Sequence, residues 1–168
     1  DASKFSALAS ELANHAVLVN DEDLRRLLSN LPLVPTQDGR WARPPDAYRR
    51  TDELVAVLGD GHHLWLDPSR IPNTHSVRAL IANLGLRTSP SSRHLADRIL
   101  DLAKSYSPTE DARRASAEAF YVLSERFDHG KEAASYQTAI ADLKRTACFP
   151  AEGDTQSWHR PDELYAPF

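Results

Sequence analysis

The chain contains the same pattern twice. Residues 28–48 read LSNLPLVPTQDGRWARPPDAY, and residues 143–165 read LKRTACFPAEGDTQSWHRPDELY. In each, a polar turn with glycine separates a proline from the sequence Trp-x-Arg-Pro-x-acid-x-Tyr. Agreement at this many spaced positions predicts one structural unit used twice. The matched positions are Pro35, Trp41, Arg43, Pro44, Asp46 and Tyr48 in the first copy and Pro150, Trp158, Arg160, Pro161, Glu163 and Tyr165 in the second.

Each copy has the residue types of a small β-hairpin. Short apolar stretches flank turn residues, and a proline ends the return strand because it cannot donate to a ladder. The first hairpin should pair Val34 and Pro35 with residues 40–43, and the second should pair residues 147–150 with 157–160. Both hairpins should superpose through their Trp and Tyr residues.

The repeated tryptophan and arginine are expected to be structural. Residues two apart on a strand share a face, so Trp41 and Arg43 point the same way. We expect Trp41 to be mostly buried. Arg43 should lie against an aromatic ring or a carbonyl, or reach Asp46.

Most of the remaining chain has helical periodicity. A first helix is expected in residues 2–16, and a second with Asn20 as N-cap and Leu24, Leu27 and Leu28 as its buried face. Three amphipathic helices follow one another between residues 91 and 145, joined by short turns, and should pack as antiparallel neighbours. The middle one should begin at the SPTE sequence, with Ser107 as its cap.

The predicted fold class is therefore α+β and predominantly helical, with antiparallel helices and small two-stranded β-hairpins. We expect residues 1–168 to form a single domain from a longer chain, because the sequence starts at Asp1 and contains no methionine. Its parts are a first helix–hairpin unit at about 20–50, a helical insert at about 74–145 and a second hairpin unit at about 143–168. The second hairpin is expected to begin a further repeat.

Composition excludes several functional classes. A net charge of -4 argues against a dedicated nucleic-acid or membrane-surface protein. A single cysteine, Cys148, rules out an intramolecular disulfide and any multi-cysteine zinc site, and it favours a reducing, cytoplasmic location. No apolar run approaches the length of a membrane span, so no membrane partner is predicted.

One basic stretch belongs to the first copy alone. Arg40, Arg49 and Arg50 align with Ser157, Ala166 and Pro167 in the second copy. These three arginines are candidates for an interaction surface outside the repeated architecture. A nucleic-acid partner is disfavoured because acidic residues lie close to them in the sequence.

No catalytic or cofactor signature is present. His62, His63 and Asp67 in DGHHLWLD are weak metal-ligand candidates, but the segment alternates like a strand, which would turn adjacent histidines to opposite faces. No phosphate-cradling glycine pattern occurs, so no cofactor is predicted. Cys148 lies in an apolar strand, where a cysteine is usually buried and inert.

The hairpin pattern and a helix ending NLGLR together resemble the repeat regions outside the catalytic domain of sacsin-like proteins. The resemblance covers residues 31–48, 76–87 and 146–165. Those large chains carry an Hsp90/histidine-kinase-type ATP-binding domain, and the resemblance implies chaperone-like or scaffold work by the parent chain. Its partners would be other domains of the same chain and client proteins.

The ATP-binding domain itself is not expected in this segment. Such domains carry an acid-x-x-x-Asn helix motif and an Asp-x-Gly-x-Gly sequence, whereas Glu11 and Asn14 are only three residues apart and no Asp-x-Gly-x-Gly occurs. The preferred interpretation is therefore a non-enzymatic scaffold domain. Two alternatives remain, a nucleic-acid-binding module of a bacterial defence or repair protein and a metal-dependent hydrolase using His62, His63 and Asp67.

Overall fold

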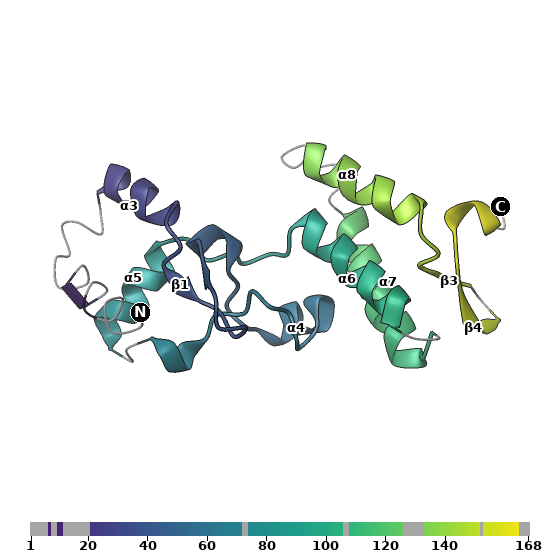
Figure 1. Cartoon of the computed structure of the whole chain (residues 1–168), viewed down its shortest axis with the longest axis horizontal. Helices are drawn as coiled ribbons and strands as arrows, with labels where there is room; N and C mark the ends of the chain where they lie inside the picture. The colour runs from purple at the N-terminus through teal and green to yellow at the C-terminus, as the bar shows by residue number, and fades with distance from the viewer. Residues whose placement is uncertain are drawn as a thin grey trace. The chain divides into compact units, whose positions relative to one another are not determined.

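The computed structural model describes residues 21–71, 74–105, 108–125, 133–151 and 153–164, together with Ala7, Ser10 and Glu11. Apart from these three residues, the helix expected in residues 2–16 lies outside the described residues. The chain divides into two compact units (Figure 1). The first comprises Asp1–Thr51 and Gly61–Thr88, and the second Asp52–Asp60 and Ser89–Phe168.

Among its described residues, the first unit combines two helices with a hairpin and two short 3-10 helices. Helix α3 is capped by Asp21, whose carboxylate accepts hydrogen bonds from the backbone N–H groups of Asp23 and Leu24. Thr74 caps α5 in the same way through the N–H of Val77. The elements are α3 (Glu22–Ser29), β1 (Val34–Pro35), β2 (Trp41–Ala42), η1 (Pro44–Asp46), η2 (Pro68–Arg70) and α5 (His75–Asn83).

The helices of the first unit share one core. The buried side chains of α5 pack with Leu28 of α3, and Leu24 adds a partly buried contact. The expected burial of Leu27 is wrong, because 60% of this residue is exposed. Residues four apart lie on the same face of a helix, so Leu24 and Leu28 form the buried face of α3. Leu27 lies outside this face. Asp21 serves as the N-cap in place of Asn20, which lies outside the described residues.

The described part of the second unit contains four helices and the second hairpin. Figure 1 shows the chain running along α6, back along α7 and forward again along α8, as expected for antiparallel neighbours. Helix α4 packs against α6 and α7. The elements are α4 (Asp52–Leu58), α6 (Ser92–Ser105), α7 (Glu110–Ser124), α8 (Ala133–Lys144), β3 (Phe149–Ala151), β4 (Asp154–His159) and η4 (Pro161–Glu163).

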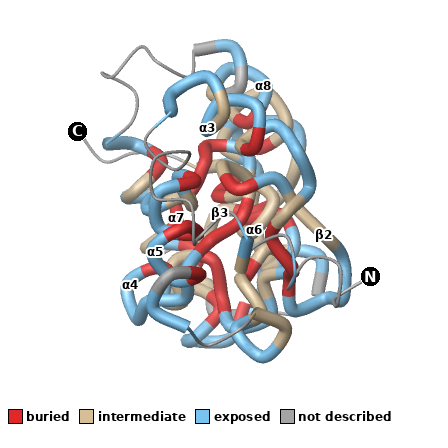
Figure 2. The backbone as a smooth tube through the Cα atoms, turned by 90° about the vertical axis from the view of Figure 1, so that its left-hand side faces the viewer, coloured by how far each residue is buried: buried red, intermediate tan, exposed pale blue. Residues whose placement is uncertain are grey.

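Apolar side chains from α6, α7 and α8 meet in a second core. Figure 2 colours the buried residues of the chain red. Leu95 and Ile99 of α6, Leu123 of α7 and Leu143 of α8 are almost completely buried in this core. At the edge of this core, Phe149 of the second hairpin stacks on Phe120 of α7, with ring centroids 4.5 Å apart. The hairpin is therefore held to the helices by aromatic packing.

Two details of the second unit differ from expectation. Helix α7 is capped by Thr109, whose hydroxyl accepts from the N–H of Ala112, in place of the expected Ser107, which lies outside the described residues. Pro108 therefore precedes the cap and does not open the helix. Helix α5, which the sequence placed with the helical insert, belongs to the first unit, while α4 belongs to the second.

The fold is therefore α+β, with six helices and two two-stranded antiparallel hairpins among the described residues. Within those residues no helix is both long and apolar enough to cross a membrane.

The end of α4 gives a test of the second unit. Gly59 has a φ of +82°, and a Cβ placed on it would lie 2.7 Å from the guanidinium carbon of Arg98. Gly59→Ala should therefore lower the free energy of unfolding by about 1–2 kcal/mol, because the left-handed conformation is strained for alanine. Urea denaturation followed by circular dichroism would measure the loss. Gly61→Ala, with open space around it, is the control, and equal stability of the two variants would contradict the argument.

Candidate interaction site

Both copies of the repeated pattern form hairpins, and two strand pairs have the same register in each copy before the second hairpin shifts register after Pro150. Val34 pairs with Ala42 and Pro35 with Trp41 in the first. In the second, Phe149 pairs with His159 and Pro150 with Trp158, and the N–H of Cys148 donates to the carbonyl of His159. The predicted pairings are confirmed, and in each copy the repeated proline lies opposite the repeated tryptophan.

In each copy, the Arg-Pro-x-acid part of the pattern forms a 3-10 turn directly after the return strand of the hairpin. Arg43 and Arg160 occupy the N-cap positions of η1 and η4, and a proline begins each turn. In the first copy the Nε of Arg43 donates to Asp46 at 2.7 Å, which is one of the three contacts expected for it. In the second the backbone N–H of Arg160 donates to the Glu163 carboxylate at 2.8 Å. In both copies the carboxylate therefore accepts a hydrogen bond from the arginine three residues before it, from the side chain in the first copy and from the backbone N–H in the second.

Tyr48, the last residue of the pattern, is the centre of the first unit. It is fully buried, and its ring meets the ring of Trp65 edge to face at 6.0 Å. Its N–H donates to the carbonyl of Leu64, and its carbonyl accepts from the N–H of Leu66. The tyrosine thereby holds the segment around Trp65 beside the hairpin. Its counterpart Tyr165 lies outside the described residues, so superposition through both tyrosines stays a prediction.

Trp41 is mostly buried, as expected, but part of its surface remains exposed. The guanidinium that lies over its ring is that of Arg70, 5.0 Å from the ring centroid. The tryptophan that fills the core is Trp65, which is fully buried. The apolar alternation around Trp65 was the one sequence signal for this role.

The weak metal-ligand candidates do not converge. Residues 61–64 form a turn, so the strand expected there is wrong, and only isolated bridges involve Trp65 and Leu66. The His62 and His63 rings lie 4.9 Å apart instead of on opposite faces. The Asp67 carboxylate accepts from the N–H and hydroxyl of Ser69. Across the described residues, no group of three or more His, Cys, Asp or Glu side chains could hold a metal ion.

Cys148 packs in the core of the second unit and is completely buried. Burial raises the pKa of its thiol to about 11. The thiol is therefore protonated at neutral pH and is a poor nucleophile.

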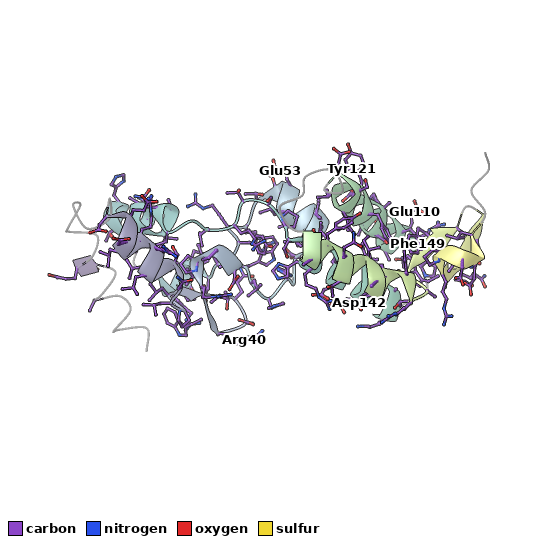
Figure 3. All side chains as sticks on the ribbon, turned by 90° about the horizontal axis from the view of Figure 1, so that it is seen from above. Arg40, Glu53, Glu110, Tyr121, Asp142 and Phe149 are labelled. Carbon is purple, nitrogen blue, oxygen red and sulfur yellow. The ribbon has the colours of Figure 1, made fainter. Side chains whose placement is uncertain are left out.

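The first unit contains a cavity of about 660 Å³, within the range of ligand-binding pockets. Its wall combines apolar side chains with the arginines Arg49, Arg50 and Arg78, the last from α5. Two of these belong to the predicted interaction surface, but Arg40 does not line the cavity. Arg40, labelled in Figure 3, is in an ion pair with Asp38 at 2.6 Å.

The Asp38–Arg40 pair belongs to the hairpin turn. Burial alone would raise the pKa of Asp38, but hydrogen bonds from the Thr36 hydroxyl and from Arg40 lower it to about 2. The carboxylate is therefore ionised at neutral pH and engaged within the turn. Arg78 was missed by sequence reasoning, because only the packing of α5 brings it to the cavity.

Comparison with protein-family models, with curated proteins and with solved structures gives no match for this chain.

Proposed function

We propose that this chain is a non-enzymatic scaffold or interaction domain of a larger, sacsin-like protein whose ATP-binding domain lies elsewhere in that protein. The observation that carries the proposal is the matched construction of the two hairpins, with proline opposite tryptophan and an acid bound back to the arginine position. Repeated architectural units are the sequence signature of chains that act through extended surfaces.

The environment of the repeated residues supports a structural role for them. Pro35, Pro44 and Tyr48 are among the most deeply buried side chains of the first unit. Asp46 is bound to Arg43. Residues used in this way build a scaffold and are not available to a substrate.

Nucleic-acid binding is the second candidate, and the arginines of the cavity favour it. Single-stranded nucleic acid is held by basic grooves combined with exposed aromatic rings on which bases stack. The cavity's described lining includes no Phe, Tyr or Trp side chain. The neighbouring Tyr48 and Trp65 are fully buried, so this candidate ranks below the scaffold role.

ATP binding tests the proposal directly. Calorimetric titration of the isolated chain with ATP and magnesium should give no binding heat, because no phosphate-cradling glycine pattern occurs in the sequence. The parent protein with its ATP-binding domain is the positive control. A stoichiometric micromolar site in the isolated chain would contradict a non-enzymatic role.

The same parent protein tests the scaffold role. Removal of residues 1–168 should leave ATP hydrolysis intact and should weaken suppression of client aggregation, followed by light scattering. Loss of ATP hydrolysis with unchanged aggregation would place the ATPase machinery in this segment and overturn the proposal.

A further inference from the structure

The cavity of the first unit has an apolar side built from three separate segments. Leu66 comes from the segment paired with Tyr48, Ile71 from the end of η2 and Ile81 from α5. Ala79 and Ala82 of α5 also line it, and both are exposed. Small side chains at these two positions leave room for an incoming aliphatic group.

The polar side of the cavity is cationic. Arg49 and Arg78 line it and are exposed, and Arg50 lines it beside them. Among the described residues, no hydrogen bond or ion pair engages the guanidinium of Arg49 or Arg78. The described lining contains no carboxylate.

The acids nearest in sequence to lining residues are engaged elsewhere. Asp38, which follows Gln37, binds Arg40 and the Thr36 hydroxyl. Asp67, which follows Leu66, binds Ser69. The cavity is therefore a local cationic site on a chain whose net charge is -4, and its charge calls for an anionic partner.

We propose that this cavity binds an acidic segment of a partner protein in which carboxylates alternate with aliphatic side chains. The carboxylates pair with Arg49 and Arg78, because a guanidinium matches a carboxylate with two parallel hydrogen bonds. The aliphatic side chain fills the space between Leu66, Ile71 and Ile81. The inference rests on the proposed interaction role and names the partner chemistry for it.

The choice of an acidic–aliphatic partner depends on both the apolar side and the cationic side of the cavity. A phosphate or nucleic-acid backbone would use the arginines and leave the apolar side unfilled. A neutral apolar peptide would leave the guanidinium groups of Arg49 and Arg78 without counter-charges. An acidic–aliphatic segment satisfies both, with binding that weakens as ionic strength rises.

Fluorescence anisotropy of the whole chain with a labelled peptide of Glu-Leu repeats tests the proposal. The peptide should bind, while a Lys-Leu peptide and a Glu-Ser peptide should bind at least about tenfold more weakly. A single-stranded oligonucleotide and decanoate are the competing probes. Preference for either over the Glu-Leu peptide would overturn the choice of partner.

Substitutions of cavity residues test whether the peptide binds in the cavity. R49E and R78E should each weaken peptide binding by about tenfold or more, and A82W should weaken it by filling the apolar side without changing the charge. R145E is the matched control, because Arg145 is exposed on the second unit. Circular dichroism confirms that each variant is folded.

Each outcome has one meaning. Loss of binding in R49E, R78E and A82W with normal binding in R145E supports the proposal, and equal loss in R145E would show non-specific attraction and overturn it. Absence of binding by the wild-type chain would also overturn it. That failure would leave the scaffold role intact, because the ATP titration and the deletion in the parent protein test that role separately.

Discussion

Trp65→Ala should lower the free energy of unfolding by about 3–5 kcal/mol, the usual cost of removing a fully buried aromatic side chain. Trp65 has no exposed surface, and its ring packs edge to face on the rings of Tyr48 and His62. Its removal leaves a void beside Tyr48, where the hairpin and the 64–67 segment meet. Native domains have stabilities of only about 5–15 kcal/mol, so the first unit should be badly destabilised.

Trp41→Ala is the matched control for this variant. Part of the Trp41 surface is exposed, with Arg70 over its ring, whereas Trp65 is fully buried, so removal of Trp41 should cost clearly less than removal of Trp65. Urea denaturation followed by circular dichroism compares the two. A larger loss for Trp41→Ala would show that the hairpin, and not the Tyr48–Trp65 contact, is the main source of stability.

Leu143→Ala should lower the free energy of unfolding by about 2–5 kcal/mol, because the truncation leaves a cavity in the core of the second unit. Leu143 lies on α8, only 1% of it is exposed, and it packs with side chains of α6 and α7. Its carbonyl also accepts a contact from the Cys148 thiol at 3.6 Å. The substitution therefore weakens the place where α8 leads into the second hairpin.

The control for this variant is Tyr121→Ala on α7. Tyr121, labelled in Figure 3, is 67% exposed, and its truncation should change stability by about 0.5 kcal/mol or less. Thermal and urea denaturation of both variants would measure the difference. Similar losses for Leu143→Ala and Tyr121→Ala would contradict the position of the second core.

Hairpins and helices could be predicted from the sequence where residues close along the chain determine them. Pro35 and Trp41 are separated by turn residues, so their pairing follows from the sequence between them. The helix at Ser92–Ser105 follows from the spacing of Leu95, Ile99 and Leu102. The cap of α7 was predicted at Ser107, but Thr109, which also carries a hydroxyl and lies two residues later, caps the helix.

The candidate site was predictable only in part. Arg49 and Arg50 stood out because the second copy lacks them. Arg78 and Ile81 did not, because they lie on a helix far along the chain whose position depends on the core with Leu28. Arg40 was grouped with Arg49 and Arg50 by sequence proximity, but Asp38 binds it in the turn.

The sequence by itself determined the repeated hairpins and the helical character of the remainder, because each depends on residues close along the chain. Only the tertiary structure decided which tryptophan fills the core and which arginines share a cavity. Those outcomes depend on contacts between distant segments, such as Tyr48 with Trp65. The periodicity of apolar side chains predicts which face of a helix or strand is buried, but the packing of the whole chain decides which other segment covers that face.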